Sequence, residues 1–397
     1  MGINNSPPGD NPVLPVNKQS PMNIDCSFPG GNIVVERAEE DAAWVRQDLR
    51  DTDGQWFYWC FRVTGTGGKT VRFHFTGSVA IGARGPAVSL DGGENWRWLG
   101  IEGVEKNSFV FTFPPESREV FFCVTIPYTG KDWETFMNRT GEPCFLEKGT
   151  LCLTRQGRPV EKLKVGCLHG TPLHRAVVTA RHHCCETIAN FVLEGLVSFV
   201  LGDSGEGDWL RNHVEFLVVP FMDREGVEAG DQGKNRKPHD HNRDYNESPI
   251  YPETAALKAL LPAWSAGLLH VALDLHCPWL KGKGTNETLY LVGANSPAIW
   301  AEQQRFSGIL EKVKTGSLPY LPADNLPYGT DWNVEKNFTG GKSCARWIGE
   351  QEGVALVTTI EVPYANVRDA VVTATSAREF GADLGRAIAG YLCEMKN

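Results

Sequence analysis

Length, composition and charge place this chain among ordinary globular proteins. Its 397 residues, 41% hydrophobic and 22% charged, are enough for two domains and a large core. The net charge of −9 argues against nucleic-acid binding, which needs clustered lysine and arginine. No apolar run is long enough to span a bilayer, because the longest, residues 187–201, contains Asn190 and Glu194. We therefore expect neither a nucleic acid nor a membrane as a partner.

The first 23 residues are polar and rich in proline, asparagine and glycine, without the apolar core of a signal peptide. We expect residues 1–23 to form a flexible lead-in. The chain has eleven cysteines, an odd number without regular disulfide spacing. Several lie in apolar strand contexts (Cys60, Cys123 and Cys167), which favours buried, reduced thiols. The predicted location is the cytoplasm.

Residues 24–150 have an all-β pattern. Aromatic and β-branched runs at 56–63, 70–76, 110–113 and 120–126 are separated by clusters of glycine and aspartate. Short strands with turn signals between them predict an antiparallel β-sandwich domain. Aromatic residues at alternate positions are what the core of a sandwich needs, so we interpret them as core rather than as a ligand site.

Strands alternate with helices after about residue 150. Strand-like segments at 163–168, 176–180, 214–219, 268–275 and 354–360 are interspersed with helical patterns near 187–201, 253–265, 297–314 and 376–394. This alternation predicts that residues 151–397 form an α/β domain with a central mixed sheet flanked by helices.

Polar residues follow three of these strands and suggest a metal site. His183 and Glu186 are three residues apart at a strand-to-helix turn, so both can point toward one spot at the carboxyl edge of the sheet. His276 and Glu361 end two other strands. Two histidines and one carboxylate with an open position form the ligand set of catalytic zinc in peptidases, and the spare carboxylate would serve as the general base. Asp274 could orient the imidazole of His276.

Two readings of this region stay open from the residues alone. His182 with Glu186 forms an i, i+4 pair, which is an alternative register for the first ligand pair. The polar loop 233–245 carries two arginines, which suit carboxylate binding and oxyanion stabilisation.

Residues 160–395 resemble a zinc carboxypeptidase of the metallocarboxypeptidase (M14) family, whose fold is carboxypeptidase/phosphorylase-like. The motifs are His-x-x-Glu within Ala180–Thr187, Asp274-Leu275-His276, Asn242-Arg243 and Thr359-Ile360-Glu361. The N-terminal part is similar to the β-sandwich that precedes the catalytic domain in the cytosolic carboxypeptidase branch. Phe113-Pro114-Pro115 and Ile126-Pro127-Tyr128 match the Phe-Pro and Pro-Tyr signatures of that branch.

The resemblance implies a zinc-dependent hydrolase, with one zinc per chain, that removes single residues from the C-termini of peptides or proteins. His183, Glu186 and His276 would hold the zinc, and Glu361 would be the general base and acid. The oligomeric state is not implied.

The resemblance also implies how the substrate is bound. Asn242 and Arg243 would grip its terminal carboxylate, and Arg236 would polarise the scissile carbonyl. Arg346 lies on the segment that lines the side-chain pocket in this family, where a cation would favour acidic C-terminal residues. The alternative is that Arg346 and Lys342 are solvated loop charges.

The chain departs from the family pattern at two places. Cys184-Cys185 stands between the first two ligands, where relatives have Pro-Gly. The substrate-capping tyrosine has no clear match, since Tyr328 lies upstream and Phe338 is nearer the expected position. The residues leave two other functions open: a zinc deacylase or amidohydrolase acting on small N-acyl amino acids, and a non-catalytic peptide-binding protein.

Overall fold

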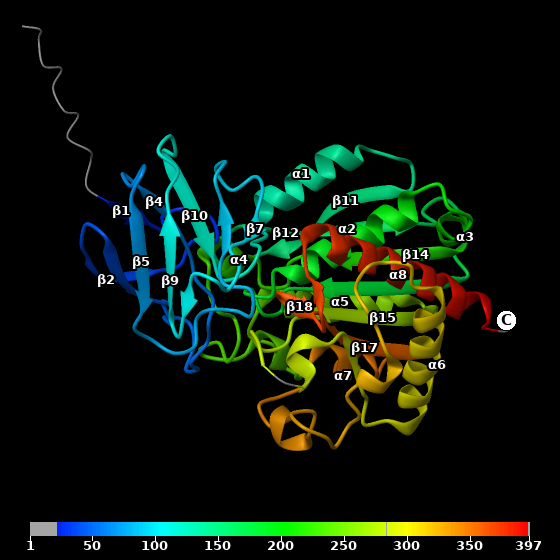
Figure 1. Cartoon of the computed structure of the whole chain (residues 1–397). Coiled ribbons are helices and arrows are strands. Elements are labelled where there is room, and N and C mark those ends of the chain that lie inside the picture. The colour runs from blue at the N-terminus through cyan, green and yellow to red at the C-terminus, as the bar shows by residue number, and fades with distance from the viewer. Residues whose placement is uncertain (1–21, 283, 396–397) are drawn as a thin grey trace, which may run out of the picture.

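The computed structural model describes residues 22–282 and 284–395, which form three main sheets with helices packed around the largest (Figure 1). The predicted flexible segment 1–23 lies outside the described residues except for its last two. Asn23 already belongs to the first strand, β1.

The N-terminal part contains two five-stranded sheets. The first has the order β1 (Asn23–Asp25), β4 (Cys60–Thr64), β10 (Glu119–Cys123), β6 (Ala87–Ser89) and β7 (Arg97–Trp98). The second has the order β2 (Val34–Ala38), β3 (Ala42–Arg46), β5 (Thr70–Phe75), β9 (Ser108–Thr112) and β8 (Val104–Glu105).

Aromatic rings from both sheets meet between them. Phe61 of β4 and Phe122 of β10 each lie 5.5 Å, between ring centroids, from Phe73 of β5. Phe109 of β9 lies 5.2 Å from Phe122. These rings are buried, so the alternating aromatics do form core, as the sequence predicts. The sheets are not wholly antiparallel: β3 and β5 pair in parallel, because between them the chain crosses into the other sheet as β4.

Two expectations for the N-terminal part need correction. The predicted strand at 56–63 begins only at Cys60, because the preceding backbone pairs elsewhere: the Tyr58 N–H donates to the Gln232 side chain, 2.8 Å away. The region also contains a helix, α1 (Gly130–Thr140), which starts at a capping box on Thr129 and buries residues at helical spacing.

The largest sheet has seven strands and is mixed, as predicted. Its order is β11 (Leu146–Leu153), β12 (Pro159–Gly166), β14 (Val214–Val219), β13 (His174–Ala180), β15 (Leu269–His276), β17 (Leu356–Glu361) and β16 (Tyr290–Val292). The central strands β14, β13, β15 and β17 are parallel, and the flanking pairs are antiparallel. β11 extends across the predicted boundary at residue 150.

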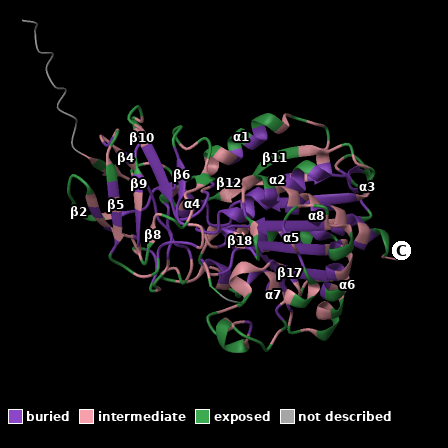
Figure 2. Ribbon diagram, viewed as in Figure 1, coloured by how far each residue is buried: buried purple, intermediate pink, exposed green. Residues whose placement is uncertain are grey.

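Helices cover both faces of this sheet. The four predicted helices are confirmed as α2 (Ile188–Leu201), α5 (Pro252–Ser265), α6 (Pro297–Val313) and α8 (Ala374–Cys393). α2 and α8 pack together over one face, while α5 and the short α7 (Cys344–Ile348) contact the other (Figure 1). Successive residues of β13 belong to opposite cores: Val177 packs on the α5 side, and Ala176 and Val178 on the α2 side. The central strands are accordingly buried along their length (Figure 2).

The remaining elements are short. They are α3 (Gly205–His213), α4 (Arg224–Ala229), four 3₁₀ turns (His241–Arg243, Gly284–Glu287, Pro322–Asp324 and Glu335–Phe338) and the hairpin β18 (Asn366–Val367) with β19 (Ala370–Val371). Within the described ranges, no single helix is long and apolar enough to cross a membrane. The helices α2 and α3 have that length and apolarity only when they are taken together, as a pair bent by 87°. All eleven cysteines lie in the described part and are free thiols.

Candidate active site

Three neighbouring parallel strands bring the predicted metal ligands and base to one edge of the sheet. β13 ends at Ala180, and the turn that follows carries His183 and Glu186 before α2 begins. β15 ends at His276 and β17 ends at Glu361, and these two residues are register partners. The carboxyl edge of parallel strands is where α/β proteins place ligands, so the position of the cluster follows from the topology.

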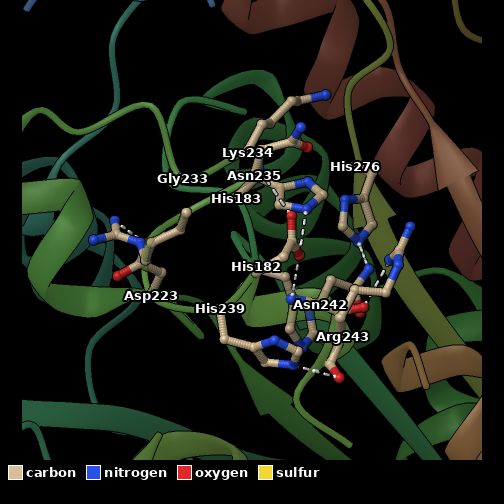
Figure 3. A network of polar contacts seen from close by, with 12 residues as sticks. His182, His183, Asp223, Gly233, Lys234, Asn235, His239, Asn242, Arg243 and His276 are labelled. Atoms are coloured by element: carbon tan, nitrogen blue, oxygen red, sulfur yellow. Dashed lines mark hydrogen bonds and ion pairs between the residues drawn. The ribbon is translucent and has the colours of Figure 1, made fainter. Parts of the chain in front are cut away.

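His183, Glu186 and His276 converge on one point. The Nδ1 atom of His183 is 3.0 Å from Glu186 Oε1, and Nδ1 of His276 is 2.7 Å from Glu186 Oε2. One ligand atom from each residue lies within 4.8 Å of the others. The two imidazoles lie close to each other in Figure 3, with ring centroids 5.0 Å apart. This is a set of two nitrogens and one oxygen, which suits zinc.

The outer nitrogen of each imidazole faces a carboxylate. Nε2 of His183 is 3.3 Å from Asp240 Oδ1, and Nε2 of His276 is 2.8 Å from Asp274 Oδ2. Carboxylates in this position fix the tautomer and orientation of metal-binding histidines. Asp274 therefore lies where the sequence predicts an orienting partner, and Asp240 is a second one that the sequence analysis missed.

The charge state of Glu186 also fits a metal ligand. Its side chain is buried, with one carboxylate oxygen facing each of the two imidazoles. Burial alone would raise its pKa, but Lys234, His276 and His183 together hold the pKa well below its usual range. A carboxylate that stays ionised is what metal binding requires.

His182 does not take the place of His183. It forms a second group with Asp274 and His276 that also has metal-ligating atoms, but its nitrogens are engaged. Nδ1 is 2.9 Å from Asp274 Oδ1, and Nε2 is 2.7 Å from the Tyr245 hydroxyl. His182 is fully buried and lines neither of the two cavities beside the metal cluster, whereas His183 lines both.

The turn between His183 and Glu186 is formed by Cys184-Cys185 and is held by hydrogen bonds. Arg181, buried and in a left-handed backbone conformation (φ 62°), donates from Nε to the carbonyl of Cys184 at 2.9 Å. The Cys184 thiol donates to the Asp231 carbonyl at 3.0 Å. A buried guanidinium thus ties the turn together, and both ligands reach the cluster.

Glu361 lies beside the cluster without a partner of its own. Its side chain is buried, and Oε2 makes no hydrogen bond in the described part of the chain. Burial raises the pKa of Glu361 to about 7, against the opposing effect of His276. A carboxyl group that titrates near neutral pH can both accept and return a proton.

Two cavities, each of about 320 Å³, meet at the cluster. Both are lined by His183, Arg243, Trp332 and Glu361. The first cavity is also lined by Asn242, Tyr328, Phe338, Lys342 and Arg346. The second cavity is also lined by Glu186, Lys234, Asp240, Trp56, Trp279 and Tyr290. The group of His183, Glu186 and His276 therefore has open space on two sides.

Asn242 and Arg243 are both at the first cavity, in a 3₁₀ turn. The Asn242 amide lies 3.1 Å from His276 Nε2, and its carbonyl accepts from the backbone N–H of Cys344 at 2.9 Å. Arg243 donates to the Asn242 and Asn337 carbonyls and has no carboxylate ion-pair partner within the described ranges. Its guanidinium is therefore available to an anion.

Arg346 lines the first cavity, but its charge is partly taken up. Its guanidinium lies 3.1 Å from Glu335 and 3.5 Å above the Phe338 ring. Lys342 is likewise paired with Glu350 at 2.7 Å. The Tyr328 hydroxyl donates to Glu335 at 2.6 Å. Tyr328 and Phe338 both line this cavity.

Arg236 is not brought into the site, contrary to the role that the resemblance implies. Its guanidinium is bound by Asp223 and lies 3.0 Å from Asp231, and it lines neither cavity. The reason is electrostatic: acidic side chains on both sides of the loop hold the cation away from the cluster.

Lys234, two residues earlier, occupies the place that Arg236 does not. Its ammonium is 2.7 Å from Glu186 Oε1 and donates to the Cys277 carbonyl at 2.9 Å. Burial alone would lower the pKa of Lys234, but Glu186 raises it overall, so the side chain stays charged. Figure 3 shows Lys234 on the opposite side of the imidazoles from Asn242 and Arg243. The only signal in the sequence was its position in the same polar loop.

Comparisons with known proteins agree with this geometry. No protein-family model matches the chain. Cytosolic carboxypeptidase 2 of Xenopus tropicalis is 27% identical over 303 residues, which cover 72% of this chain and 29% of that protein. Cytosolic carboxypeptidase 3 of Mus musculus is 24% identical over 375 residues, covering 82% and 35%. The chain thus spans about a third of the length of these curated relatives.

Solved structures match over almost the whole chain. The metallo-carboxypeptidase from Burkholderia cenocepacia has a TM-score of 0.78 and 20% identity, covering 94% of this chain and 99% of that one. The metallo-carboxypeptidase from Pseudomonas aeruginosa, in complex with (2-guanidinoethylmercapto)succinic acid, has a TM-score of 0.75 and 20% identity, covering 94% and 100%. The resemblance seen in the motifs is confirmed: the chain has the metallocarboxypeptidase fold and is a relative of the cytosolic carboxypeptidases.

Proposed function

We propose that this chain is a zinc-dependent carboxypeptidase that hydrolyses the C-terminal bond of peptides or proteins. The observation that carries the proposal is the convergence of His183, Glu186 and His276 beside the unpartnered carboxyl of Glu361. The relationship to cytosolic carboxypeptidases supports it. One zinc ion per chain would be held by the two imidazoles and the Glu186 carboxylate.

The chemistry would divide between the metal and Glu361. When bound at such a site, zinc supplies a positive charge that polarises a carbonyl and lowers the pKa of water toward neutrality. Glu361 accepts a proton from the attacking water and returns it to the amine that leaves. The burial that raises the pKa of Glu361 favours its taking up the proton.

The substrate would lie across both cavities. Arg243, supported by Asn242, binds the terminal carboxylate from the first cavity, because guanidinium binds carboxylates bidentately. Lys234 faces the scissile carbonyl from the second cavity and takes the stabilising role that the resemblance gives to Arg236. Arg346 favours an acidic C-terminal side chain in the first cavity.

The domain assignment belongs to the same proposal. Residues 24–150 would be a β-sandwich domain that supports the catalytic domain, residues 151–397. The names of the relatives support a cytoplasmic location and peptide C-termini as the substrates.

The test combines metal analysis with Glu361→Gln. We expect about one zinc per purified chain and release of single C-terminal residues from peptides. Glu361→Gln should lower kcat by about 10²–10⁴-fold, since it cannot accept the proton, while the zinc content is unchanged. A control is Glu311→Gln on the exposed face of α6, which should leave kcat unaltered.

The same assay separates the other functions. Turnover of N-acyl amino acids but not of peptides would indicate a deacylase. Peptide binding without turnover, in protein that lacks zinc, would indicate a binding protein.

A further inference from the structure

The proposed function places the C-terminal residue of the substrate in the first cavity and leaves the second cavity for the chain that precedes the scissile bond. Arg243, Asn242 and Arg346 at the first cavity would hold the C-terminal residue. The cluster of His183 and Glu361 lies at the junction of the two cavities. The residue before the scissile bond must therefore enter the second cavity.

Four aromatic side chains line that second cavity: Trp56, Trp279, Tyr290 and Trp332. They come from four different segments of the chain. The rings of Trp56 and Trp279 pack against each other with centroids 5.0 Å apart and a tilt of 51°. The Lys234 ammonium lies 5.4 Å from the centre of the Trp56 ring. Two indole rings in contact thus form an apolar part of the wall of a cavity whose other lining residues include Lys234 and Asp240.

The Trp56–Trp279 pair is supported by packing against a third aromatic ring, that of Phe57. Phe57 packs edge-on against Trp279, with centroids 5.1 Å apart, and against buried Tyr364, with centroids 5.4 Å apart. An aromatic wall that is packed in this way loses little conformational entropy when a side chain binds to it.

Trp56 comes from the N-terminal part of the chain, and its segment is tied to the loop that carries Lys234. The Asp51 carboxylate accepts from the backbone N–H groups of Gln232 and Gly233 at 3.0 and 2.9 Å. Thr52 Oγ1 donates to the Lys234 carbonyl at 2.7 Å. Of the described residues that line the second cavity, Trp56 alone precedes the seven-stranded sheet.

We propose that the Trp56–Trp279 wall is the subsite for the penultimate residue of the substrate and selects large apolar or aromatic side chains there. This inference rests on the proposed carboxypeptidase function. It gives the N-terminal two-sheet unit a direct part in substrate recognition, because that unit supplies half of the wall.

The test uses blocked tripeptides that share one C-terminal residue and carry phenylalanine, glycine or glutamate at the penultimate position. For the wild-type zinc enzyme we expect kcat/KM about tenfold higher with phenylalanine than with glycine. Trp56→Ala should remove this ratio, and Trp56→Phe should restore most of it. Trp44→Ala is the matched control, because Trp44 lies on β3 and lines neither cavity.

A binding measurement keeps the inference separate from the proposed function. Calorimetry on Glu361→Gln with the same peptides should give tighter binding of the phenylalanine peptide, with a similar ratio, which Trp56→Ala abolishes in the double variant. Equal binding of the three peptides, or a preference for glutamate, overturns the subsite even if peptides are hydrolysed. Failure of hydrolysis with the binding ratio intact instead overturns the carboxypeptidase function.

Discussion

Lys234 and Arg236 stand two residues apart in one loop, but their surroundings differ in kind. Lys234 points at the metal cluster, 2.7 Å from Glu186. Arg236 points into an acidic group formed by Asp223 and Asp231, with 12% of its side chain exposed. Removal of the Lys234 charge should therefore affect catalysis, and removal of the Arg236 charge should affect the stability of the fold.

Lys234→Met should lower kcat by about 10²-fold with the zinc content retained, because a preorganised charge near the reacting carbonyl is lost. Lys234→Arg should recover part of the rate. Arg236→Met should instead destabilise the fold by ~3–5 kcal/mol, because the buried Asp223 carboxylate loses its ion-pair partner, whereas Asp231 keeps Arg50. Steady-state kinetics and denaturant unfolding on all three variants test this. Arg236→Met with normal stability and a lost kcat would reverse the assignment.

Arg346 makes the second prediction at this scale. Its partner Glu335 is 69% exposed, and exposed ion pairs contribute little, so a substrate carboxylate can replace Glu335. We expect Arg346→Ala to lower kcat/KM about tenfold or more for peptides ending in glutamate, with little change for leucine. Lys342→Ala, at the same cavity, is the control. Equal losses for both peptides would mean that Arg346 is a solvated loop charge.

At the scale of elements, α2 and α8 approach each other at glycines on both helices. A Cβ atom on Gly195 of α2 would overlap the carbonyl oxygen of Arg378, and one on Gly381 of α8 would overlap that of Val192. Because backbone cannot yield as a flexible side chain can, this contact fixes α2. The N-terminus of α2 follows the turn with His183 and Glu186, so the contact also supports the ligands.

Gly381→Ala should therefore lower the free energy of unfolding by ~1–3 kcal/mol, the usual cost of overpacking a close contact. Gly308→Ala, in α6, is the matched control, since a Cβ there meets nothing within 4 Å. It should stabilise the protein by ~0.5–1 kcal/mol through helix propensity. Urea unfolding of both variants provides the measurement, and equal effects would contradict the close-contact argument.

At the scale of the whole molecule, the group of His183, Glu186 and His276 joins segments that are far apart in sequence. It connects the turn after β13, the end of β15 and, through Lys234 and Asp51, the N-terminal unit. A metal bound only by the folded chain should thus stabilise all of these parts together.

We expect chelation of zinc to lower the melting temperature and zinc addition to restore it. At a zinc concentration a thousandfold above Kd the stabilisation would be about 4 kcal/mol. His276→Ala should remove the zinc dependence, which makes it the control. A melting temperature that is insensitive to both chelator and zinc would contradict a metal held by these residues.

The sequence predicted the elements of the catalytic part well, and the reason is local. The four main helices and the central strands have periodic apolar patterns, and the structure places their ends within a few residues of the predicted bounds. The helix α1 was missed although its buried residues have helical spacing, because it lies inside a region that reads as all-β. The strand β16, only three residues long, was missed because it is too short to show a period. Residues 56–59 have strand composition but lie in an irregular segment, because tertiary contacts with Gln232 take up their backbone.

By itself, the sequence determined the nature of the fold and the cluster of His183, Glu186, His276 and Glu361, because residues that end parallel strands must meet at one edge of a sheet. Only the tertiary structure decided which loop side chains reach that edge. Arg236 turns toward Asp223 and Asp231, Lys234 turns toward Glu186, and Trp56 arrives from another part of the chain. The physical reason is that the direction of a loop side chain depends on charges and surfaces supplied by segments distant in sequence, which no local pattern encodes.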